Sequence, residues 1–474
     1  MKYLCETKKS AALILISLVG LGATSNVYAQ TSTPVDGRII VDQTEFAPIN
    51  TSLGNVVEEV CPQLVGRSNT QQNSPESAER DLQVRCTEMV VARGNGVSGP
   101  ELEEVLYQAN AEEVATQGTG LVRLSAIQTV AVAARLTELR IADAGSGPGL
   151  ALNQDTGSMH FGYARGGSAG ESDFGRWSIY VNGELSSADK DPTANEAGFD
   201  LDGGGITAGA DYRAKDNLFV GVNLALTTSE ADMDNGGALD SDGQSVTAYV
   251  TSYNDNGWYF EGTAGFGQND YEQTRRIIYT LGSTAVNQTA LGDTEGDQAF
   301  ASIGAGKDYV KDALVISISG NLDYLNADID GFSETISDTR AGFGLGMEVD
   351  DQSIDSLRTT LGVQISKSIS TNRGVIAPYA RAEWVHQFED DPRSTSARFL
   401  SDPFSAGFNN TSNFDGTSIF TLVTDEPDED YFRLSGGLSS VSANGLQLFA
   451  ALDTLVGLDD ISQFIVTAGI RKEL

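Results

Sequence analysis

The sequence predicts an all-β transmembrane barrel of about twelve antiparallel strands, preceded by a small N-terminal α-helical domain. The first observation is a period of two: in NLFVGVNLALT, residues Leu218, Val220, Val222, Leu224 and Leu226 share one face, because successive strand side chains point to opposite sides. The second is length, since these segments run to ten or more residues. Strands of soluble sandwiches average about 5–6 residues, whereas a tilted strand needs about ten to cross a bilayer.

The third observation is that short and long connections alternate along the chain. The short ones are 214–216, 254–257, 310–312, 371–374 and 442–445. The longer ones are 186–200, 230–243, 272–295, 327–353, 391–429 and 457–461. This alternation is typical of an outer-membrane barrel, with tight turns on the periplasmic side and long loops outside. An even number of strands places both ends of the barrel in the periplasm.

The N-terminus predicts a secretory signal peptide over residues 1–29. Basic residues precede the apolar run Ala11–Leu21, and Val27, Tyr28 and Ala29 form a small-residue cleavage site. No later run of 18 apolar residues occurs, so any membrane span in the mature chain must be β.

Composition excludes several functional classes. The net charge is −36 and the pI about 4.2, which argues against binding to nucleic acid phosphates. The chain has 2 His residues, so a zinc site has few ligands available. No phosphate-binding loop is present. We therefore expect no nucleic acid partner, no metal and no cofactor.

Two cysteines remain after signal cleavage, Cys61 and Cys86. An even pair in an exported protein predicts a disulfide bond rather than a metal site. Closing a loop of roughly 25 residues contributes on the order of 3 kcal/mol in the loop-entropy model.

The domain organisation changes near residue 141. Residues 30–140 are expected to form the helical domain, 141–173 a Gly- and Ser-rich linker, and 174–474 the barrel. The expected helices are Ser52–Cys61, Pro75–Val91, Gly99–Thr116 and Thr119–Arg140.

The chain ends on a stripe of alternating apolar residues. They are Phe464, Val466, Ala468, Ile470 and Leu474. Either lipid around a closed barrel or the core of a soluble exported β-protein would satisfy this stripe; strand length and loop alternation favour lipid.

At this point the chain resembles the autotransporters of the type V secretion family. The resemblance covers roughly residues 170–474 and depends on these segments: GITAGADYRAKDNLFVGVNLALTTSEADMD, NGWYFEGTAGFGQNDYEQTRRI, LDYLNADIDGFSE, IAPYARAEWVHQFEDD and NGLQLFAALDTLVGLDDISQFIVTAGIRKEL. It implies a twelve-stranded pore with a helix threaded through it, which anchors or translocates a short N-terminal passenger. Family members usually end on Phe or Trp, which the barrel-assembly machinery recognises, whereas this chain ends on Leu474.

The resemblance also implies a location and partners. The location is the outer membrane of a Gram-negative bacterium, with the N-terminal part periplasmic or on the cell surface. The partners are membrane lipid, lipopolysaccharide and the barrel-assembly machinery. A closed barrel needs no second chain to satisfy its edges, so we expect a monomer.

The helix predicted at Leu121–Arg140 is a candidate for the threaded segment. It would be about 30 Å long, enough to cross the hydrocarbon layer. Its pore-plug candidates are Arg123, Arg135 and Arg140. Charged residues predicted to line the lumen are Asp211, Glu261, Asp323, Arg381 and Glu383. The alternative is that this helix belongs to the core of the α-domain and that the linker threads the pore.

Motifs for catalysis are weak. Ser168 in GGSAG lies in a predicted linker, not in the strand–turn–helix that a nucleophile elbow requires. His386 is expected in an interfacial aromatic belt; a hydrolase using His386 with Asp390 and Asp391 is kept as an alternative. We expect a transporter, not an enzyme. Arg275 and Arg276 could pair with loop carboxylates or with lipopolysaccharide phosphate.

Overall fold

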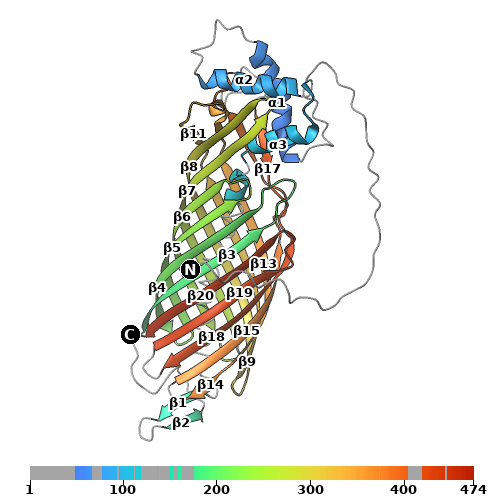
Figure 1. Ribbon diagram of the computed structural model, residues 1–474. Coiled ribbons are helices and arrows are strands. Elements are labelled where there is room, and N and C mark those ends of the chain that lie inside the picture. The colour runs from blue at the N-terminus through green and yellow to red at the C-terminus, as the bar shows by residue number, and fades with distance from the viewer. Residues whose placement is uncertain are drawn as a thin grey trace, which may run out of the picture.

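The computed structural model of the protein describes residues 48–66, 77–92, 95–111, 113–118, 136, 149–153, 158–162, 176–372, 374–403, 419–442 and 446–473 (Figure 1). Structural statements below concern these ranges. The predicted signal peptide and most of the predicted helix Thr119–Arg140 lie outside them.

Twelve long antiparallel strands close a barrel, as the sequence predicts. The strands are β3 (Trp177–Lys190), β4 (Phe199–Lys215), β5 (Leu218–Met233), β6 (Ala238–Tyr253), β7 (Trp258–Leu281), β8 (Thr284–Lys311), β9 (Leu314–Ile329), β13 (Gln352–Lys367), β15 (Gly374–Gln387), β18 (Asp430–Ser442), β19 (Leu446–Val456) and β20 (Ile461–Glu473). The last strand, β20, pairs with the first, β3. Closure leaves no barrel edge exposed to lipid.

The two faces of the barrel wall differ as the period of two requires. On β5, Leu224 and Leu226 point outward and are 65% and 64% exposed, whereas Asn223 and Thr227 point inward and are buried. Apolar side chains outside and polar ones inside are typical of a membrane barrel.

Two of the predicted long loops are strands instead. The hairpin β5–β6 continues to Met233 and Ala238, and β7–β8 continues to Leu281 and Thr284. Inward and outward side chains still alternate in these extensions, and Ile277 and other inward side chains pack beneath the helices. Extended strands are therefore favoured over open loops at this end of the barrel.

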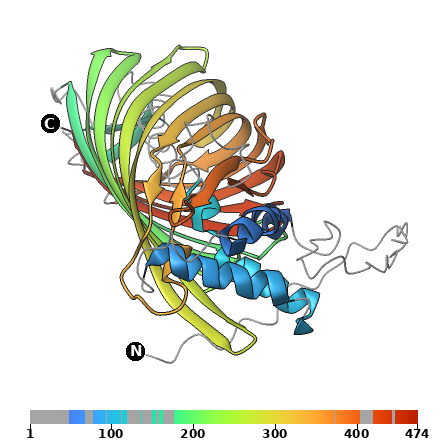
Figure 2. The same cartoon turned by 90° about the horizontal axis from the view of Figure 1, so that it is seen from above.

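The helices lie over the long-loop end of the barrel (Figures 1 and 2). They are α1 (Pro48–Gly66), α2 (Ala78–Ala92) and α3 (Gly99–Ala109), and residues 113–118 are also helical. Ser98 and Glu101 form a capping box that fixes the start of α3. No helix in the described ranges has the length and hydropathy of a membrane span.

Loops of the barrel form a small sheet beneath these helices. Its four strands are β10 (Phe332–Ser333), β12 (Met347–Val349), β16 (Ser394–Phe399) and β17 (Phe420–Val423). Helices α1–α3 and this sheet share one apolar core, which includes Leu53, Leu82, Leu106, Met347 and Phe420. We call α1–α3 together with this sheet the cap.

Two short strands, a 3-10 helix and a two-stranded hairpin complete the fold. β11 (Thr335–Ile336) pairs antiparallel with β8, and β14 (Ile369–Thr371) pairs with β15. The turn η2 (Phe343–Leu345) is a 3-10 helix. β1 (Gly149–Asn153) and β2 (Ser158–Gly162) pair within the predicted linker and are drawn below the short-turn end in Figure 1.

Candidate functional site

A buried ion pair joins the cap to the barrel wall. Arg275 projects inward from β7 and is 1% exposed. Its Nε and Nη2 donate to the two carboxylate oxygens of Glu334 over 2.8 and 2.6 Å. The same guanidinium donates to the carbonyls of Leu345 and, at the end of α3, Ala109. Arg275 therefore binds Glu334 at the margin of the small sheet, Leu345 in a loop and Ala109 in a helix. The contact with Glu334 has the bidentate geometry that arginine favours.

Glu113 completes this cluster. It is fully buried, and Asn235 in the β5–β6 turn donates to it over 3.4 Å. Burial raises the pKa of Glu113 to about 7, although the nearby Arg275 opposes the rise. Two carboxylates thus share one guanidinium, so a proton on Glu113 balances the charge of the cluster.

The first turn of α2 docks on the η2 turn. Asp81 accepts hydrogen bonds from the backbone amides of Gly342 and Gly344 over 3.0 and 2.9 Å. A Cβ on Gly344 would lie 2.3 Å from the carbonyl oxygen of Ala78. Only glycine therefore permits this approach of loop and helix.

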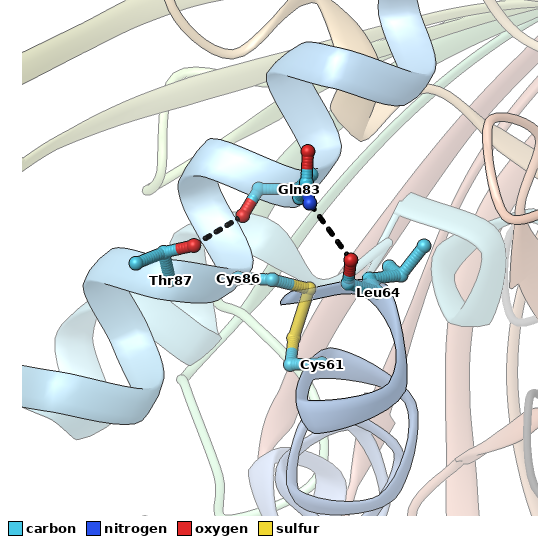
Figure 3. Close-up of a disulfide and its surroundings, with 5 residues drawn as sticks. All are labelled: Cys61, Leu64, Gln83, Cys86 and Thr87. Atoms are coloured by element: carbon cyan, nitrogen blue, oxygen red, sulfur yellow. Dashed lines mark hydrogen bonds between the residues drawn. A yellow bond between two sulfur atoms is a disulfide. The ribbon is translucent and has the colours of Figure 1, made fainter. Parts of the chain in front are cut away.

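The predicted disulfide between Cys61 and Cys86 is present and joins α1 to α2 (Figure 3). Beside it, Gln83 donates to the carbonyl of Leu64 over 2.8 Å, and Thr87 donates to the carbonyl of Gln83. The covalent bond and the side-chain hydrogen bond fix the two helices relative to one another.

Residues 113–118, which we call the collar, cross the long-loop mouth of the barrel. Gln117 donates to Gln273 of β7 over 2.9 Å and accepts from Gln352 of β13 over 2.8 Å. At the next residue, a Cβ on Gly118 would lie 2.5 Å from the guanidinium of Arg393. The collar is therefore held at the mouth by β7 and β13, which are separated in the barrel wall by β8 and β9.

Leu136 lies deep in the lumen. Leu136 is helical, 3% exposed, and packs with Tyr180, Phe219 and Tyr249. These three aromatic residues lie near the short-turn ends of β3, β5 and β6. Below them, Asp211 accepts hydrogen bonds from Tyr249 and, over 2.7 Å, from Ser178.

A cavity of about 80 Å³ adjoins Leu136. Its charged lining residues are Glu261, Asp323, Arg358, Arg381, Glu383 and Arg433. Arg381 lies 3.6 Å from Glu383, and Arg433 lies 3.7 Å from it. Opposite charges therefore meet inside the barrel, as a water-filled polar lumen permits.

A larger cavity of about 340 Å³ lies beside the collar at the mouth. Lys190 spans its rim, with its Nζ 2.7 Å from Asp425 and 3.5 Å from Glu196. Arg393, which the collar approaches at Gly118, also lines this cavity. The contacts of Lys190 fasten the loop around Asp425 to the end of β3.

Comparison with protein families decides the identity of the barrel. The model described as autotransporter beta-domain matches residues 179–453, more than half of the chain. The chain belongs to the autotransporter β-domain family. It is accordingly a protein of the Gram-negative outer membrane whose barrel is a translocator domain.

Solved autotransporter barrels are similar to this one. The translocator domain of NalP from Neisseria meningitidis is 14% identical, with a TM-score of 0.47 over 64% of this chain and 90% of that one. The β-domain of Bordetella BrkA is 17% identical, with a TM-score of 0.44 over 63% of this chain and 100% of that one. A comparison with curated proteins found no match.

The residues predicted to line the autotransporter lumen all project inward. Asp211 accepts a hydrogen bond from Tyr249 of the aromatic group around Leu136, and Glu261, Asp323, Arg381 and Glu383 line the 80 Å³ cavity. The plug candidates Arg123, Arg135 and Arg140 lie outside the described residues, so their role stays a prediction.

The C-terminal stripe lies on the lipid-facing side of the autotransporter barrel. Phe464, Val466 and Ile470 are 50%, 41% and 45% exposed, and Ala468 is exposed with them. Leu474 lies outside the described residues. Exposed apolar side chains in this row match the hydrocarbon around a membrane barrel.

His386 also faces outward on the autotransporter barrel. Its Nδ1 lies 3.0 Å from Asp430, and Trp384 donates to the same carboxylate over 2.8 Å. The imidazole stacks on Trp384 and meets the edge of Phe388. These contacts agree with the interfacial aromatic belt predicted for His386; the belt and the hydrolase alternative both stay predictions.

The residues that dock the cap are not evident from the sequence. Arg275 is expected to pair with loop carboxylates, but its partner Glu334 lies 59 positions away, and no pattern in the sequence points to Glu113 or Asp81. The available signal was an arginine beginning the apolar run RRIIYT. A charge beside β-branched and aromatic residues indicates a buried ion pair only when its partner is known.

Proposed function

We propose that this autotransporter exports its N-terminal helices through its own barrel and keeps them on the cell surface as a docked cap. The observation that supports this most directly is the path of the chain. Gln117 is bound at the long-loop mouth, Leu136 lies near the short-turn end, and β3 begins at that end. Long loops of such barrels face the outside of the cell.

Lengths agree with a helix between these two points. From residue 118 to 136 the chain has 18 steps, which at about 1.5 Å per residue span roughly 27 Å as a helix. On the barrel wall, the same interval is represented by Leu239 and Tyr249 of β6, which are ten residues apart. At about 3.3 Å per residue and a tilt of about 40°, they rise roughly 25 Å. A helix over 121–140 therefore fits the lumen better than an extended linker.

The plug candidates would then face compatible charges. Arg135 is adjacent to Leu136, whose surroundings include Glu261, Asp323 and Glu383. Guanidinium groups on the threaded segment would pair with these carboxylates, so Arg123, Arg135 and Arg140 remain our candidates for holding it.

Retention of the cap follows from its shared core. Leu82 and Leu106 of the helices pack in one cluster with Met347 and Phe420 of the barrel loops. Releasing the helices would expose both sides of this cluster to water. The free-energy cost of that exposure is about 25 cal/mol per Å² of apolar surface. We propose an anchored passenger within residues 30–140, joined by the segment 141–173 to a monomeric barrel that the barrel-assembly machinery inserts beside lipopolysaccharide.

Site-specific labelling of intact cells tests this orientation. Pro100→Cys places a thiol on the exposed start of α3, and Asn256→Cys places one in the exposed β6–β7 turn. We expect a membrane-impermeant maleimide to label Pro100→Cys in intact cells and Asn256→Cys only after the outer membrane is permeabilised.

The reverse pattern, with Asn256→Cys labelled first, would show that the cap lies in the periplasm and would reject export. Heat-modifiable gel migration of both variants serves as the control for barrel folding. Full-length size of the labelled Pro100→Cys band distinguishes a retained cap from a cleaved one.

A further inference from the structure

The lysines of the barrel are concentrated at its short-turn end. All six lysines beyond residue 9 lie on barrel strands. Lys190 is at the mouth, where its side chain is buried. The other five lie at or near the short-turn ends of their strands: Lys215, Lys307, Lys311, Lys367 and Lys472.

Three of these lysines form a group on the outer face of neighbouring strands. Lys311 of β8 and Lys367 of β13 are exposed, and both pair with Leu314 of β9, which lies between them. Neighbouring strands are about 4.8 Å apart, so the backbones at the two lysines are about 10 Å apart. Lys307 lies on the same face of β8, four residues from Lys311. We call Lys307, Lys311 and Lys367 the lysine group.

Two aromatic side chains border the lysine group. The Nζ of Lys307 lies 5.2 Å from the ring centroid of Trp258 and 5.1 Å from that of Tyr309. The two side chains are 47% and 51% exposed. Trp and Tyr side chains on the outside of a membrane barrel lie at the level of the lipid headgroups. The lysine group is therefore at the depth of the phosphates of a phospholipid.

The lysine group has no salt bridge within the part of the chain that the structure describes. Asp308 is the carboxylate nearest to Lys307 in the sequence, but it accepts a hydrogen bond from Ser317 over 2.5 Å. Asp312 lies in the turn after β8. An anion that approaches this face from the membrane therefore displaces no salt bridge of the barrel.

Apolar side chains continue from the lysine group towards the middle of the membrane. Ile318 of β9 pairs with Lys307 on one side and with Val363 of β13 on the other. Ile318, Val363 and Ile365 are 49%, 46% and 49% exposed on the lipid-facing side. Cations at the headgroup level with aliphatic side chains beside them fit a phospholipid, in which a phosphate is followed by acyl chains. Free phosphate would use the cations alone.

The outer face has the opposite charge at its long-loop end. Asp240 pairs with Glu272 and Asp242 with Asp270 across β6 and β7, and all four side chains are exposed. The outward-facing Trp384 donates to a carboxylate, that of Asp430. Charge on the outer face therefore changes sign between the two membrane interfaces.

From these observations we infer that the lysine group binds the phosphate of an anionic phospholipid, whose acyl chains lie along β8, β9 and β13. A lysine ammonium binds phosphate as a point charge. Each lysine near an anionic membrane surface contributes about fivefold in affinity. Binding requires only the outer-membrane barrel, whereas its placement in the periplasmic leaflet rests on the export orientation proposed above.

Fluorescence quenching by brominated lipids tests this site, because the chain has three tryptophans and one of them borders the lysine group. Trp177→Phe with Trp384→Phe leaves Trp258 as the reporter. The full chain is reconstituted in phosphatidylcholine vesicles that contain a minor fraction of brominated phosphatidylglycerol or of brominated phosphatidylcholine. Half-maximal quenching by each brominated lipid then measures its affinity for the surface around Trp258.

Two further proteins complete the comparison. Lys311→Gln with Lys367→Gln, in the Trp258 background, removes two charges and leaves the contact between Lys307 and Trp258 in place. A protein that keeps only Trp384 reports on the acidic interface. Heat-modifiable migration confirms folding of each protein.

We expect Trp258 to be half-quenched at a fraction of brominated phosphatidylglycerol at least about fivefold below that of brominated phosphatidylcholine. The two lipids should quench equally in the double lysine variant and at Trp384. Equal quenching of Trp258 with all lysines present would overturn the inference. A preference that survives in the folded double variant, or that Trp384 shares, would overturn it as well, because the lysine group would not be its source.

The test is separate from that of the export orientation. Labelling of Asn256→Cys before Pro100→Cys would reject that orientation and leave the lipid preference at Trp258 unchanged. Equal quenching would reject the lipid site and leave the labelling pattern unchanged, so the two failures are distinguishable.

Discussion

Glu113 is the residue through which pH acts on the docking of the cap. Its neighbours are Arg275 on β7, Glu334 before β11 and Asn235 in the β5–β6 turn. Because its pKa rises from 4.5 to about 7 on burial, the docked state holds a proton that the undocked state loses. The contribution of the Glu113 proton to docking is therefore fully present below pH 4.5 and is lost as pH rises through 4.5 to 7, by about 3 kcal/mol in total.

We predict that the melting temperature of the cap falls between pH 5 and pH 8 in the wild type. Glu113→Gln keeps the shape of the side chain and removes the titration, so its melting temperature should be nearly independent of pH over this range. Circular dichroism of the helices in detergent measures both. A wild-type profile as flat as that of Glu113→Gln would contradict the burial of an ionisable carboxyl at this junction.

Gly344 tests the contact between α2 and the η2 turn. An added Cβ would meet the carbonyl oxygen of Ala78 at 2.3 Å and the amide nitrogen of Leu82 at 2.6 Å, both of them backbone atoms. We predict that Gly344→Ala weakens docking by about 1–3 kcal/mol, the usual range for overpacking, and speeds proteolysis of the cap.

The matched control for that substitution lies two residues away. A Cβ on Gly346 meets no atom closer than 3.8 Å, and its φ is −63°. Gly346→Ala should leave protease resistance unchanged. Equal resistance of the two variants would show that the η2 turn does not hold α2.

At the scale of elements, the disulfide joins α1 and α2 into one unit. The two cysteines are 25 positions apart in the sequence. Closing a loop of this length stabilises the folded state by about 3 kcal/mol in the loop-entropy model, and removing the bond loses that stabilisation. We predict that Cys61→Ser together with Cys86→Ser lowers the melting temperature of the cap while the barrel keeps its heat-modifiable migration. Loss of that migration would mean that the barrel needs the cap in order to fold.

The strands of the barrel wall are predictable from sequence because each one repeats the same two-sided environment. Leu224 outside and Asn223 inside are local signals that need no knowledge of the partner strand. The β7–β8 extension is expected as a loop because Arg275 and Arg276 interrupt the apolar pattern. The burial of an arginine there is explained by distant partners: Glu334 and the carbonyls of Ala109 and Leu345.

The four-stranded sheet of the cap was missed for a related reason. Its strands contribute between 2 and 6 residues each, too short to show a period. They are extended because Met347 and Phe420 pack under α1–α3, and such tertiary packing overrides local propensity. The disulfide, by contrast, was predictable, because only one pairing of two cysteines exists.

At the scale of the whole molecule, the cap and the barrel form a continuous structure. The chain is bound outside by the ion pair at Arg275, at the mouth by Gln117 and near the short turns by Leu136. The inward position of Asp211, Glu261, Asp323, Arg381 and Glu383 followed from the strand period alone. That Glu261, Asp323, Arg381 and Glu383 share a cavity with Leu136 did not, because contacts between distant parts of a chain leave no local pattern.

The central claim is that the chain passes through the lumen, and a disulfide cross-link tests it most directly. Leu136→Cys with Phe219→Cys joins two side chains that pack together inside the barrel, and Leu136→Cys with Val220→Cys uses the next residue, which faces lipid. Under oxidation in outer membranes, we predict a cross-link in the first pair, seen as altered gel migration, and none in the second. Absence of a cross-link in a correctly folded Leu136→Cys, Phe219→Cys protein would contradict passage of the chain through the barrel.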